Sequence, residues 1–394
     1  MKYDYIFHVL QTNLFEVKEL FSMKRFIDIH IPVTTCNLKC HYCYVTQEGV
    51  RNSEATPFNY SSEHIGKALS QERLGGICHF NMCGLGETLI PQETVDITYE
   101  ILKQGHYIMI VTNGLLTNRL QQFTKFPDEL KRRLGFKFSF HYLELQSRGL
   151  FDTFFQNVQL IKDNRMSFSI ELTPSDELEP YIDDVKKTCM EHVGAYCHVT
   201  IPRDVNKKGI ELLSRHNIED FQNIWKTFNS ELFDFKKSTW GVKRCEYCYA
   251  GAWSGLLNIG NGMLTACYGS NLVQNIFEDI SKPIHFVAVG KNCKLPHCYN
   301  SHSLLALGDI PEIKGYSYAQ ERNRINLNDN TDWLLPQMKE FLAHRLENCN
   351  CKFTPIMKFK NSLMQVQVIF NNYAYKTESR ITKVKKRLLH RGRI

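Results

Sequence analysis

The sequence contains no run of about 18 apolar residues, so no segment is predicted to cross a membrane. Its opening stretch, MKYDYIFHVLQTNLFEVKELF, carries charges throughout and lacks the basic start, apolar run and cleavage site of an export signal. Cysteine, at 14 of 394 residues, is too sparse for a disulfide scaffold. Cysteines without an export signal predict a cytoplasmic protein whose reduced thiols serve metals or catalysis.

Net charge is absent outside one end of the chain. The formal net charge is +7, and residues 376–394 alone hold eight Lys or Arg residues against one acid, Glu378. The remainder is therefore formally neutral, which argues against a nucleic-acid groove spread over the fold. We expect residues 376–394 to form a basic tail.

Short apolar runs alternate with helical patterns from residue 26 to about residue 204, as in parallel α/β units. The expected strands are 26–33, 76–83, 107–112, 135–142, 167–173 and 196–202. The expected helices are 63–74, 92–104, 118–134 with a break at Pro127, 150–162 and 179–193. This pattern predicts the α/β class and a partial (βα)6 barrel, whose chemistry lies at the carboxyl ends of the strands.

The expected domain organisation follows the changes in composition. Residues 206–240 read as a helical connector with one helix over 218–232, and residues 241–315 as a small cysteine-rich domain organised by metal. A helix over 332–347 and strands of alternating Phe, Val and Ile are expected within 316–375. The expected divisions are 1–25, 26–205, 206–240, 241–315, 316–375 and 376–394.

The first strand is followed by Cys36-Asn-Leu-Lys-Cys40-His-Tyr-Cys43. Three thiolates within eight residues can surround one soft-metal centre, because thiolates select zinc or iron–sulfur clusters. On spacing alone zinc stays open, with His30 or His41 as a fourth ligand.

Two further motifs stand at the ends of the next two strands: Cys83-Gly84-Leu85-Gly86-Glu87-Thr88, and Val111-Thr112-Asn113-Gly114. Alone, Gly-x-Gly-Glu is typical of a tight turn and Thr-Asn-Gly of a helix cap. Their order at successive strand ends, after the three cysteines, favours one shared site.

Together these motifs resemble the radical S-adenosylmethionine (SAM) superfamily, whose hallmark is C-x3-C-x2-C with an aromatic residue, here Tyr42, before the last cysteine. The resemblance covers about residues 26–204. It implies that Cys36, Cys40 and Cys43 bind a [4Fe-4S] cluster with one open iron. That iron binds SAM, which is cleaved to a 5′-deoxyadenosyl radical.

The resemblance also implies roles for the other strand-end residues. The segment with Gly84, Gly86, Glu87 and Thr88 would bind the methionine amino group, and Thr112 and Asn113 would lie near the SAM ribose. Leu85 replaces the usual glycine and Thr88 the frequent proline, so this segment is a variant. Further candidates for cofactor binding are Ser139, His141 and Arg203, with Glu171 and Thr173 beside them; the alternative is that they are satisfied polar residues of loops or core.

A second cysteine group resembles the start of a SPASM/twitch extension, which binds auxiliary iron–sulfur clusters. Its candidate ligands are Cys245, Cys248, Cys267, Cys293 and Cys298. The later C-x2-C-x5-C-x3-C run of a full SPASM domain is absent, so one auxiliary cluster is expected and one cysteine is surplus. A four-cysteine zinc ribbon is the alternative, and Cys349 or Cys351 could add a ligand.

The resemblance implies an oxidoreductase or epimerase. It would abstract hydrogen from a peptide or carbohydrate-type substrate, leading to epimerisation, oxidation or crosslinking, with a reductant such as flavodoxin or ferredoxin. Cys83 is the candidate hydrogen donor, with Cys197 second, whereas Cys78 and Cys189 are expected to pack in the core. The alternative is a non-catalytic zinc or iron–sulfur-binding regulator, against which Tyr42 and Glu87 count because a regulator needs only the cysteines.

Overall fold

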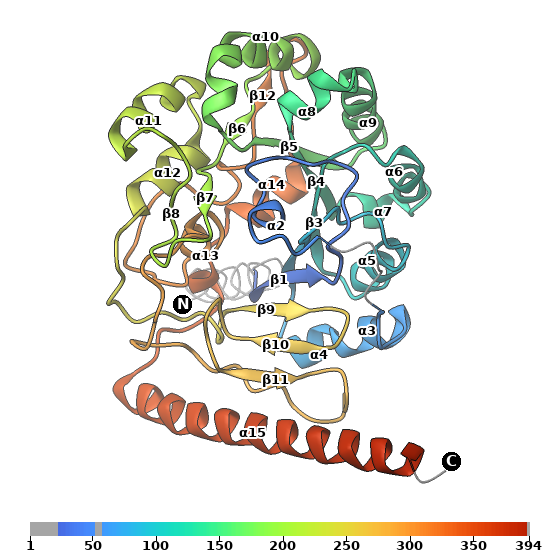
Figure 1. Ribbon diagram of the computed structural model, residues 1–394, viewed down its shortest axis with the longest axis vertical. Coiled ribbons are helices and arrows are strands. Elements are labelled where there is room, and N and C mark those ends of the chain that lie inside the picture. Colours follow the sequence, from blue (N-terminus) through green and yellow to red (C-terminus); the bar gives the residue numbers. More distant parts are fainter. Residues whose placement is uncertain (1–22, 52–56, 392–394) are drawn as a thin grey trace, which may run out of the picture.

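A computed structural model describes residues 23–51 and 57–391, with side chains up to residue 373. One sheet dominates it, with strands in the order β11-β10-β9-β1-β2-β3-β4-β5-β6 (Figure 1). Strands β1 to β6 follow the chain order and pair in parallel, which confirms the predicted α/β class and partial barrel. Their bounds are β1 Arg25–Ile31, β2 Cys78–Gly84, β3 Tyr107–Thr112, β4 Leu134–Ser139, β5 Ser167–Leu172 and β6 His198–Val199.

Helices connect these strands and cover the outside of the curved sheet (Figure 1). They are α2 Tyr44–Gln47, α3 Ser62–Ala68, α4 Gln71–Leu74, α5 Glu93–Lys103, α6 Thr117–Thr124, α7 Asp128–Lys131, α8 Tyr142–Ser147, α9 Phe151–Asp163, η1 Asp176–Tyr181 and α10 Ile182–Val193. The break expected at Pro127 is confirmed, because Pro127 precedes α7. The helix expected over 63–74 is instead two helices, since the Ser70 side chain caps α4 by accepting from Arg73 N. Helix α8 was not predicted.

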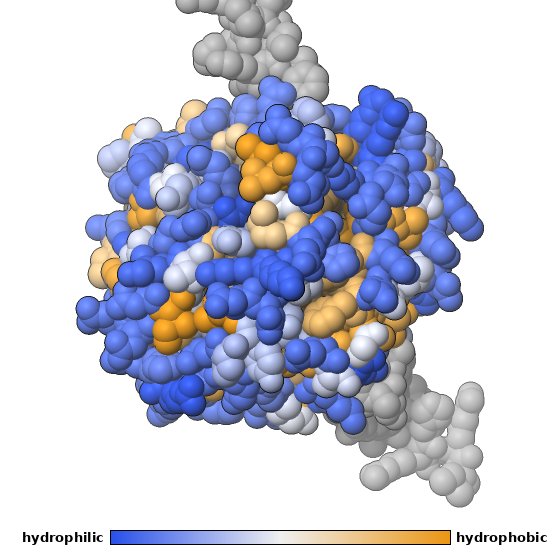
Figure 2. Space-filling view, turned by 90° about the horizontal axis from the view of Figure 1, so that it is seen from above, coloured by the Kyte–Doolittle hydropathy of each residue, from blue (hydrophilic) through white to orange (hydrophobic). Residues whose placement is uncertain are grey.

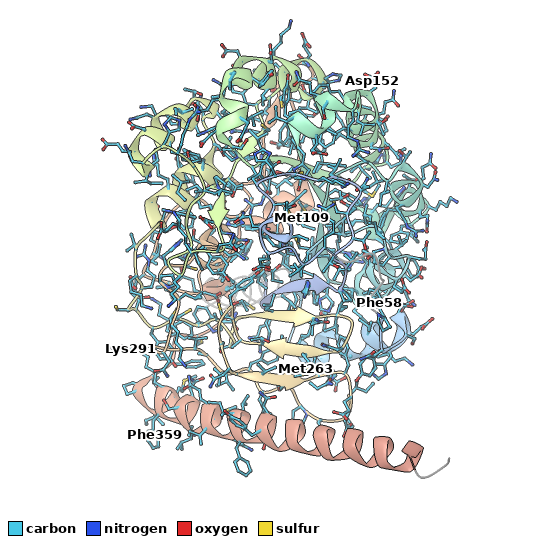
Figure 3. The ribbon with its side chains drawn as sticks, in the orientation of Figure 1. Phe58, Met109, Asp152, Met263, Lys291 and Phe359 are labelled. Carbon is cyan, nitrogen blue, oxygen red and sulfur yellow. The ribbon has the colours of Figure 1, made fainter. Side chains whose placement is uncertain are left out.

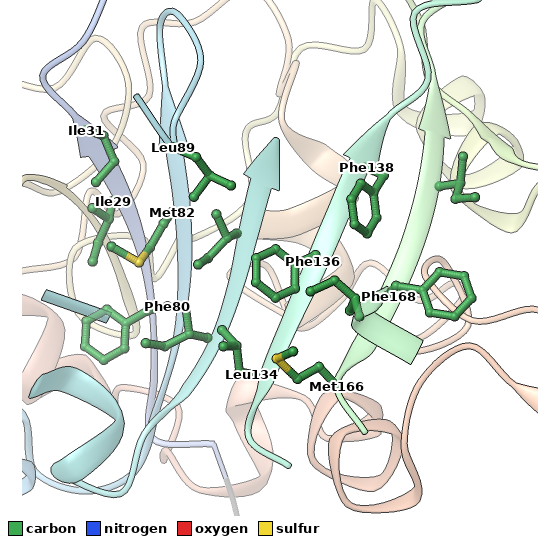
Figure 4. Close-up of a cluster of buried hydrophobic side chains, with 14 of the residues drawn as sticks. Ile29, Ile31, Phe80, Met82, Leu89, Leu134, Phe136, Phe138, Met166 and Phe168 are labelled. Carbon is green, nitrogen blue, oxygen red and sulfur yellow. The ribbon is translucent and has the colours of Figure 1, made fainter. Parts of the chain in front are cut away.

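The core lies between the sheet and these helices (Figure 4). Alternate residues of each strand point into it, among them Ile29, Phe80, Met82, Phe136 and Phe138. Burying an apolar side chain of this size contributes about 1.5–3 kcal/mol. This packing fixes the carboxyl ends of the strands relative to one another, and those ends carry the candidate motifs.

The connector after β6 contains two α-helices, so the single helix expected over 218–232 is wrong. Asn229 adopts a left-handed conformation with φ of 48°, and Ser230 then caps a new helix by accepting from Phe233 N. The elements are β7 Arg203–Asp204, β8 Glu211–Leu212, α11 Ile218–Trp225, η2 Lys226–Phe228 and α12 Glu231–Thr239.

The cysteine-rich segment continues the barrel sheet, because β9 pairs in parallel with β1. Strands β10 and β11 then add antiparallel at the edge. The remaining short elements are β9 Ser254–Asn258, β10 Met263–Thr265, β11 Val273–Asn275, α13 Ser301–Leu307, β12 Ile325–Asn326, β13 Thr331–Asp332, α14 Pro336–Ala343 and η3 Leu346–Asn348.

The strands expected before the basic tail are wrong, because one long helix, α15 (Pro355–Arg391), takes their place. Asn361 and Val368 are buried, seven positions apart, and Met364 and Gln365 between them are half-buried, which is helical spacing. The alternation of Phe, Val and Ile in this segment therefore does not reflect the period of two of a strand. Within the described residues, no helix is long and apolar enough to span a membrane.

Candidate active site

A cavity of about 600 Å³ opens at the carboxyl ends of the barrel strands. All the candidates from the barrel motifs line it, although they come from distant parts of the chain. They are Cys36, Cys40, Tyr42, Cys43, Cys83, Gly84, Gly86, Glu87, Thr88, Thr112, Asn113, Ser139, His141 and Arg203.

The three-cysteine loop follows β1 and faces this cavity. Arg51 donates a hydrogen bond of 2.6 Å to the Leu38 carbonyl, which holds the loop. Burial raises the pKa of Cys36 and raises that of Cys40 to about 12. These thiols therefore keep their protons at neutral pH unless a metal replaces them, and a set of three thiols suits a soft metal centre.

The two glycines of the second motif serve the contact between the loops after β1 and β2. A Cβ on Gly86 would lie 2.0 Å from the Thr35 carbonyl oxygen, and one on Gly84 would lie 2.6 Å from a methyl of Val33. Gly86 N donates to the Val33 carbonyl at 2.7 Å, and Glu87 N to the Thr35 carbonyl at 2.9 Å. The glycines thus bring the second motif against the start of the cysteine loop.

Glu87 joins the second motif to the third. Its Oε1 accepts from the Thr112 hydroxyl at 2.7 Å and from Leu89 N at 3.0 Å, and its Oε2 accepts from Asn113 N at 2.8 Å. The side chain is 3% exposed, and burial raises its pKa although these donors act in the opposite direction. Glu87 therefore links the ends of β2 and β3 through these hydrogen bonds, and we call this link the Glu87 brace.

Two further contacts connect the motifs to the loop. Asn113 Nδ2 donates to Asn37 Oδ1 at 2.6 Å, next to Cys36. The Tyr42 hydroxyl is hydrogen-bonded to His141 Nδ1 at 2.7 Å. Burial lowers the pKa of His141 to about 4, so this imidazole is neutral at physiological pH.

On its other side the cavity holds charged residues that were not predicted. Asp28 accepts from Asn81 Nδ2 at 2.7 Å and from the Tyr268 hydroxyl at 2.5 Å. Lys137 and Lys236 line the same side, and each is 4% exposed. Burial lowers the pKa of Lys236 to about 7. Lys137 could have been predicted as a site residue, because a lysine in the middle of a buried strand is unusual. The sequence around Lys236, on α12, contains no such indication.

Arg203 and Cys83 complete this side. The Arg203 guanidinium lies 4.7 Å from the centre of the Tyr299 ring and donates to Asn300 Oδ1 at 3.3 Å. Burial raises the pKa of Cys83 to about 12, so it stays a thiol.

The other cysteines of the barrel lie elsewhere. Cys197 is fully buried beside Cys189 and does not line the cavity, so it is not placed to donate hydrogen there. Cys78 and Cys189 are buried in the core, as predicted.

The second cysteine group also comes together. Cys248, Cys267, Cys293 and Cys298 interact electrostatically with one another, and the buried carboxyl of Asp309 acts on three of them. Burial raises the pKa of Cys248, Cys267 and Cys298.

The remaining candidates for this group differ from it in their surroundings. Cys245 is exposed. Cys349 lies beside Arg25 and Cys78, near the start of β1.

Comparison with known proteins gives structural matches alone. The sequence matches no family model and no curated protein. SuiB of Streptococcus suis, solved with S-adenosylmethionine, is 14% identical with a TM-score of 0.47, and the match covers 67% of this chain and 66% of SuiB. The chain thus spans just under two thirds of the SuiB chain.

Two other solved proteins are similar. The protein anSMEcpe, solved with AdoMet and the Cp18Cys peptide, is 16% identical with a TM-score of 0.46, over 91% of this chain and 99% of that one. BtrN, solved with AdoMet and 2-DOIA, is 15% identical with a TM-score of 0.34, over 82% and 86%. All three solved structures hold S-adenosylmethionine (AdoMet).

Proposed function

We propose that the protein is a radical SAM enzyme, with Cys36, Cys40 and Cys43 as ligands of a [4Fe-4S] cluster and SAM bound beside it. The observation that carries this proposal is the meeting of three separate motifs in one cavity, tied together by Glu87. When bound, such a cluster supplies the electron that cleaves SAM to methionine and a 5′-deoxyadenosyl radical.

The spacing of the thiols supports a cluster over a zinc ion. Four ligands about 2.3 Å from a tetrahedral zinc ion lie about 3.8 Å from one another. Across the described residues, one group of three metal-ligating side chains has all its ligand atoms within 4.8 Å of one another, and it consists of Asp176, Glu179 and His216. This group lies outside the cavity and includes the Glu179–His216 ion pair. In both cysteine groups the sulfur atoms are spaced more widely than this, and a cubic iron–sulfur core suits the wider spacing.

We assign the cavity residues to SAM as follows. The backbone of the segment from Gly84 to Gly86 receives the methionine amino group, while Glu87 holds that segment against β3. Asn113, Ser139 and His141 offer neutral polar groups for the ribose and adenine. Because its pKa is low, His141 brings no positive charge near the SAM sulfonium.

We assign Cys248, Cys267, Cys293 and Cys298 to one auxiliary cluster and leave Cys245 as the surplus cysteine. The four thiols interact with one another, and burial raises the pKa of Cys248, Cys267 and Cys298, whereas Cys245 is exposed. A buried group of thiols with raised pKa values gains most from a metal that displaces their protons.

The substrate side of the cavity supports a peptide or carbohydrate-type substrate that carries an anionic group. Lys137 and Lys236 are buried there with no acidic residue among their hydrogen-bond partners, and Arg203 lines the same cavity. A buried cation is stabilised by an anion, so a substrate carboxylate or phosphate suits this surface.

Cys83 would complete an epimerisation. The 5′-deoxyadenosyl radical takes a hydrogen atom from a substrate carbon, giving 5′-deoxyadenosine and a substrate radical. The Cys83 S–H bond then gives a hydrogen atom to the other face. The resulting thiyl regains an electron from a reductant such as flavodoxin or ferredoxin and a proton from solvent. Oxidation and crosslinking are the alternative outcomes for the same substrate radical.

Anaerobic reconstitution followed by metal counting tests the two cluster assignments. The parent should hold about eight irons, and a variant with Cys36, Cys40 and Cys43 changed to alanine should hold about four. Zinc in place of iron at the three-cysteine site would instead support the non-catalytic regulator, whereas zinc at the second group alone would support the zinc ribbon.

A further inference from the structure

Helix α15 is held to the body of the protein by one face. Asn361 accepts from Ala288 N at 2.8 Å and donates to the Ala288 carbonyl at 3.0 Å, and Gln365 donates to the same carbonyl at 2.7 Å. Val368, next on that face, is buried. These contacts fix the rotation of the helix about its axis.

The opposite face of α15 is apolar and exposed. Up to residue 373, the last whose side chain is described, six large apolar residues of this face leave between 56% and 71% of their surface exposed. They are Ile356, Phe359, Leu363, Val366, Phe370 and Tyr373. We call these six residues the apolar stripe; Phe359 marks it at the outer edge of the molecule in Figure 3.

Successive residues of the apolar stripe are three, four, three, four and three positions apart. This is the a/d repeat of helices that pair along their length, with Asn361 and Val368 at the f positions facing away from the pairing side. A helix that only stabilised the fold would need apolar residues solely on the face that packs against β11. The repeat indicates that a second helix packs on the stripe.

The area of the apolar stripe suits a stable interface. Three of its six side chains are aromatic, and together the six expose on the order of 800 Å², which is the share of one partner in a standard interface. The largest apolar patch on an ordinary monomer is about 300–600 Å². By contrast, the view onto the α10 end shows a mainly hydrophilic face with separate apolar patches (Figure 2).

We propose that two copies of this chain form a dimer by pairing the apolar stripes of their α15 helices in antiparallel orientation. Such a contact is isologous and closes after two copies. Between Ile356 and Tyr373 the charged residues are Lys358 and Lys360 alone, so little repulsion opposes the contact. A parallel pair would bring together the two basic segments 376–394, each with a net charge of +7, whereas an antiparallel pair separates them.

Antiparallel pairing fixes which residues meet. Ile356 of one copy faces Tyr373 of the other, Phe359 faces Phe370, and Leu363 faces Val366, because an a position opposes a d position in each layer. The bodies lie on the far sides of the two helices, where Asn361 and Val368 hold them. The inference does not depend on the proposed catalysis.

Sedimentation velocity on the full chain tests the dimer. The parent should sediment at micromolar concentration with twice the 46.0 kDa of one chain. The variant F359E/V366E, with two charges in the stripe, should be monomeric. The matched variant M357E/N371E places two glutamates on the same helix outside the stripe and should stay dimeric; circular dichroism verifies that both remain folded.

A photoreactive phenylalanine analogue at position 359 tests the partner and its orientation. The expected product has twice the chain mass and joins position 359 to the peptide that contains Phe370. A monomeric parent, or a product within a single chain such as one joining position 359 to residues 1–22, would overturn the proposal. A link between the two 359 positions would overturn the antiparallel orientation.

Discussion

Replacing Gly86 by alanine is the sharpest test of how the motifs are assembled. The added Cβ would lie 2.0 Å from the Thr35 oxygen and 2.6 Å from its carbonyl carbon, whereas Cβ contacts below 3.0 Å are essentially never seen. Both atoms belong to the backbone, so the loop before Cys36 must move by about an ångström or more.

The expected cost can be worked from these contacts. Overpacking of this kind costs about 1–3 kcal/mol. The movement also breaks the 2.7 Å and 2.9 Å backbone hydrogen bonds from residues 86 and 87, each contributing about 1 kcal/mol. We therefore expect Gly86→Ala to lower the free energy of unfolding by about 3–5 kcal/mol, and to lose the iron of the three-cysteine site after reconstitution.

Two other glycines supply the comparison. In Gly84→Ala the new Cβ meets a Val33 side chain at 2.6 Å, which can rotate, so a smaller loss is expected. In Gly209→Ala the nearest atom lies 3.4 Å away, an ordinary contact, so stability should be unchanged or slightly higher. Urea denaturation of the metal-free proteins and iron counting give both readouts. If Gly86→Ala matched Gly209→Ala in both, the described contact between the two loops would be incorrect.

Three further predictions follow from single contacts. Thr112→Val removes the 2.7 Å hydrogen bond to Glu87 and should destabilise the metal-free protein by about 1–2 kcal/mol; Thr112→Ser should restore it, and equal loss in both variants would count against the brace. The pKa of Lys236 is about 7 in the folded protein and 10.5 for an unperturbed lysine, as in the unfolded chain. Between these two pH values the unfolded chain therefore binds more protons than the folded protein does. The free-energy cost of burying the lysine accordingly falls as the pH rises from about 7 to 10.5. Lys236→Met should therefore have a higher free energy of unfolding than the parent near pH 7, and this difference should shrink toward pH 10. A difference in the free energy of unfolding that does not change with pH would refute the lowered pKa of Lys236. Cys293→Ala should lose about four irons per chain while Cys245→Ala loses none, and the reverse result would exchange their roles.

The sequence predicted the parts of the fold that rest on local patterns. The five longer barrel strands lie within about three residues of the runs that predicted them, because each run is apolar, short and bounded by polar or turn residues. The sequence pattern does not indicate helix α15, because its face toward β11 and its apolar stripe lie on opposite sides. Apolar residues therefore follow one another with little amphipathic contrast.

The candidate site was predictable where residues follow strand ends, as for Cys36, Glu87 and Asn113. The contact of Asp28 with Tyr268 joins residues 240 positions apart and needed the pairing of β9 with β1, which no local pattern indicates. The role of Gly86 was also visible only in three dimensions, because its neighbour Thr35 belongs to another loop.

Formation of 5′-deoxyadenosine from SAM under anaerobic, reducing conditions tests the central claim most directly. The reconstituted parent and the surface variant Cys245→Ala should both release it, detected by mass spectrometry, and Cys40→Ala should release none. Release from Cys40→Ala at the rate of the parent, or none from a parent that holds its full iron content, would contradict the assignment of this cavity to radical SAM chemistry.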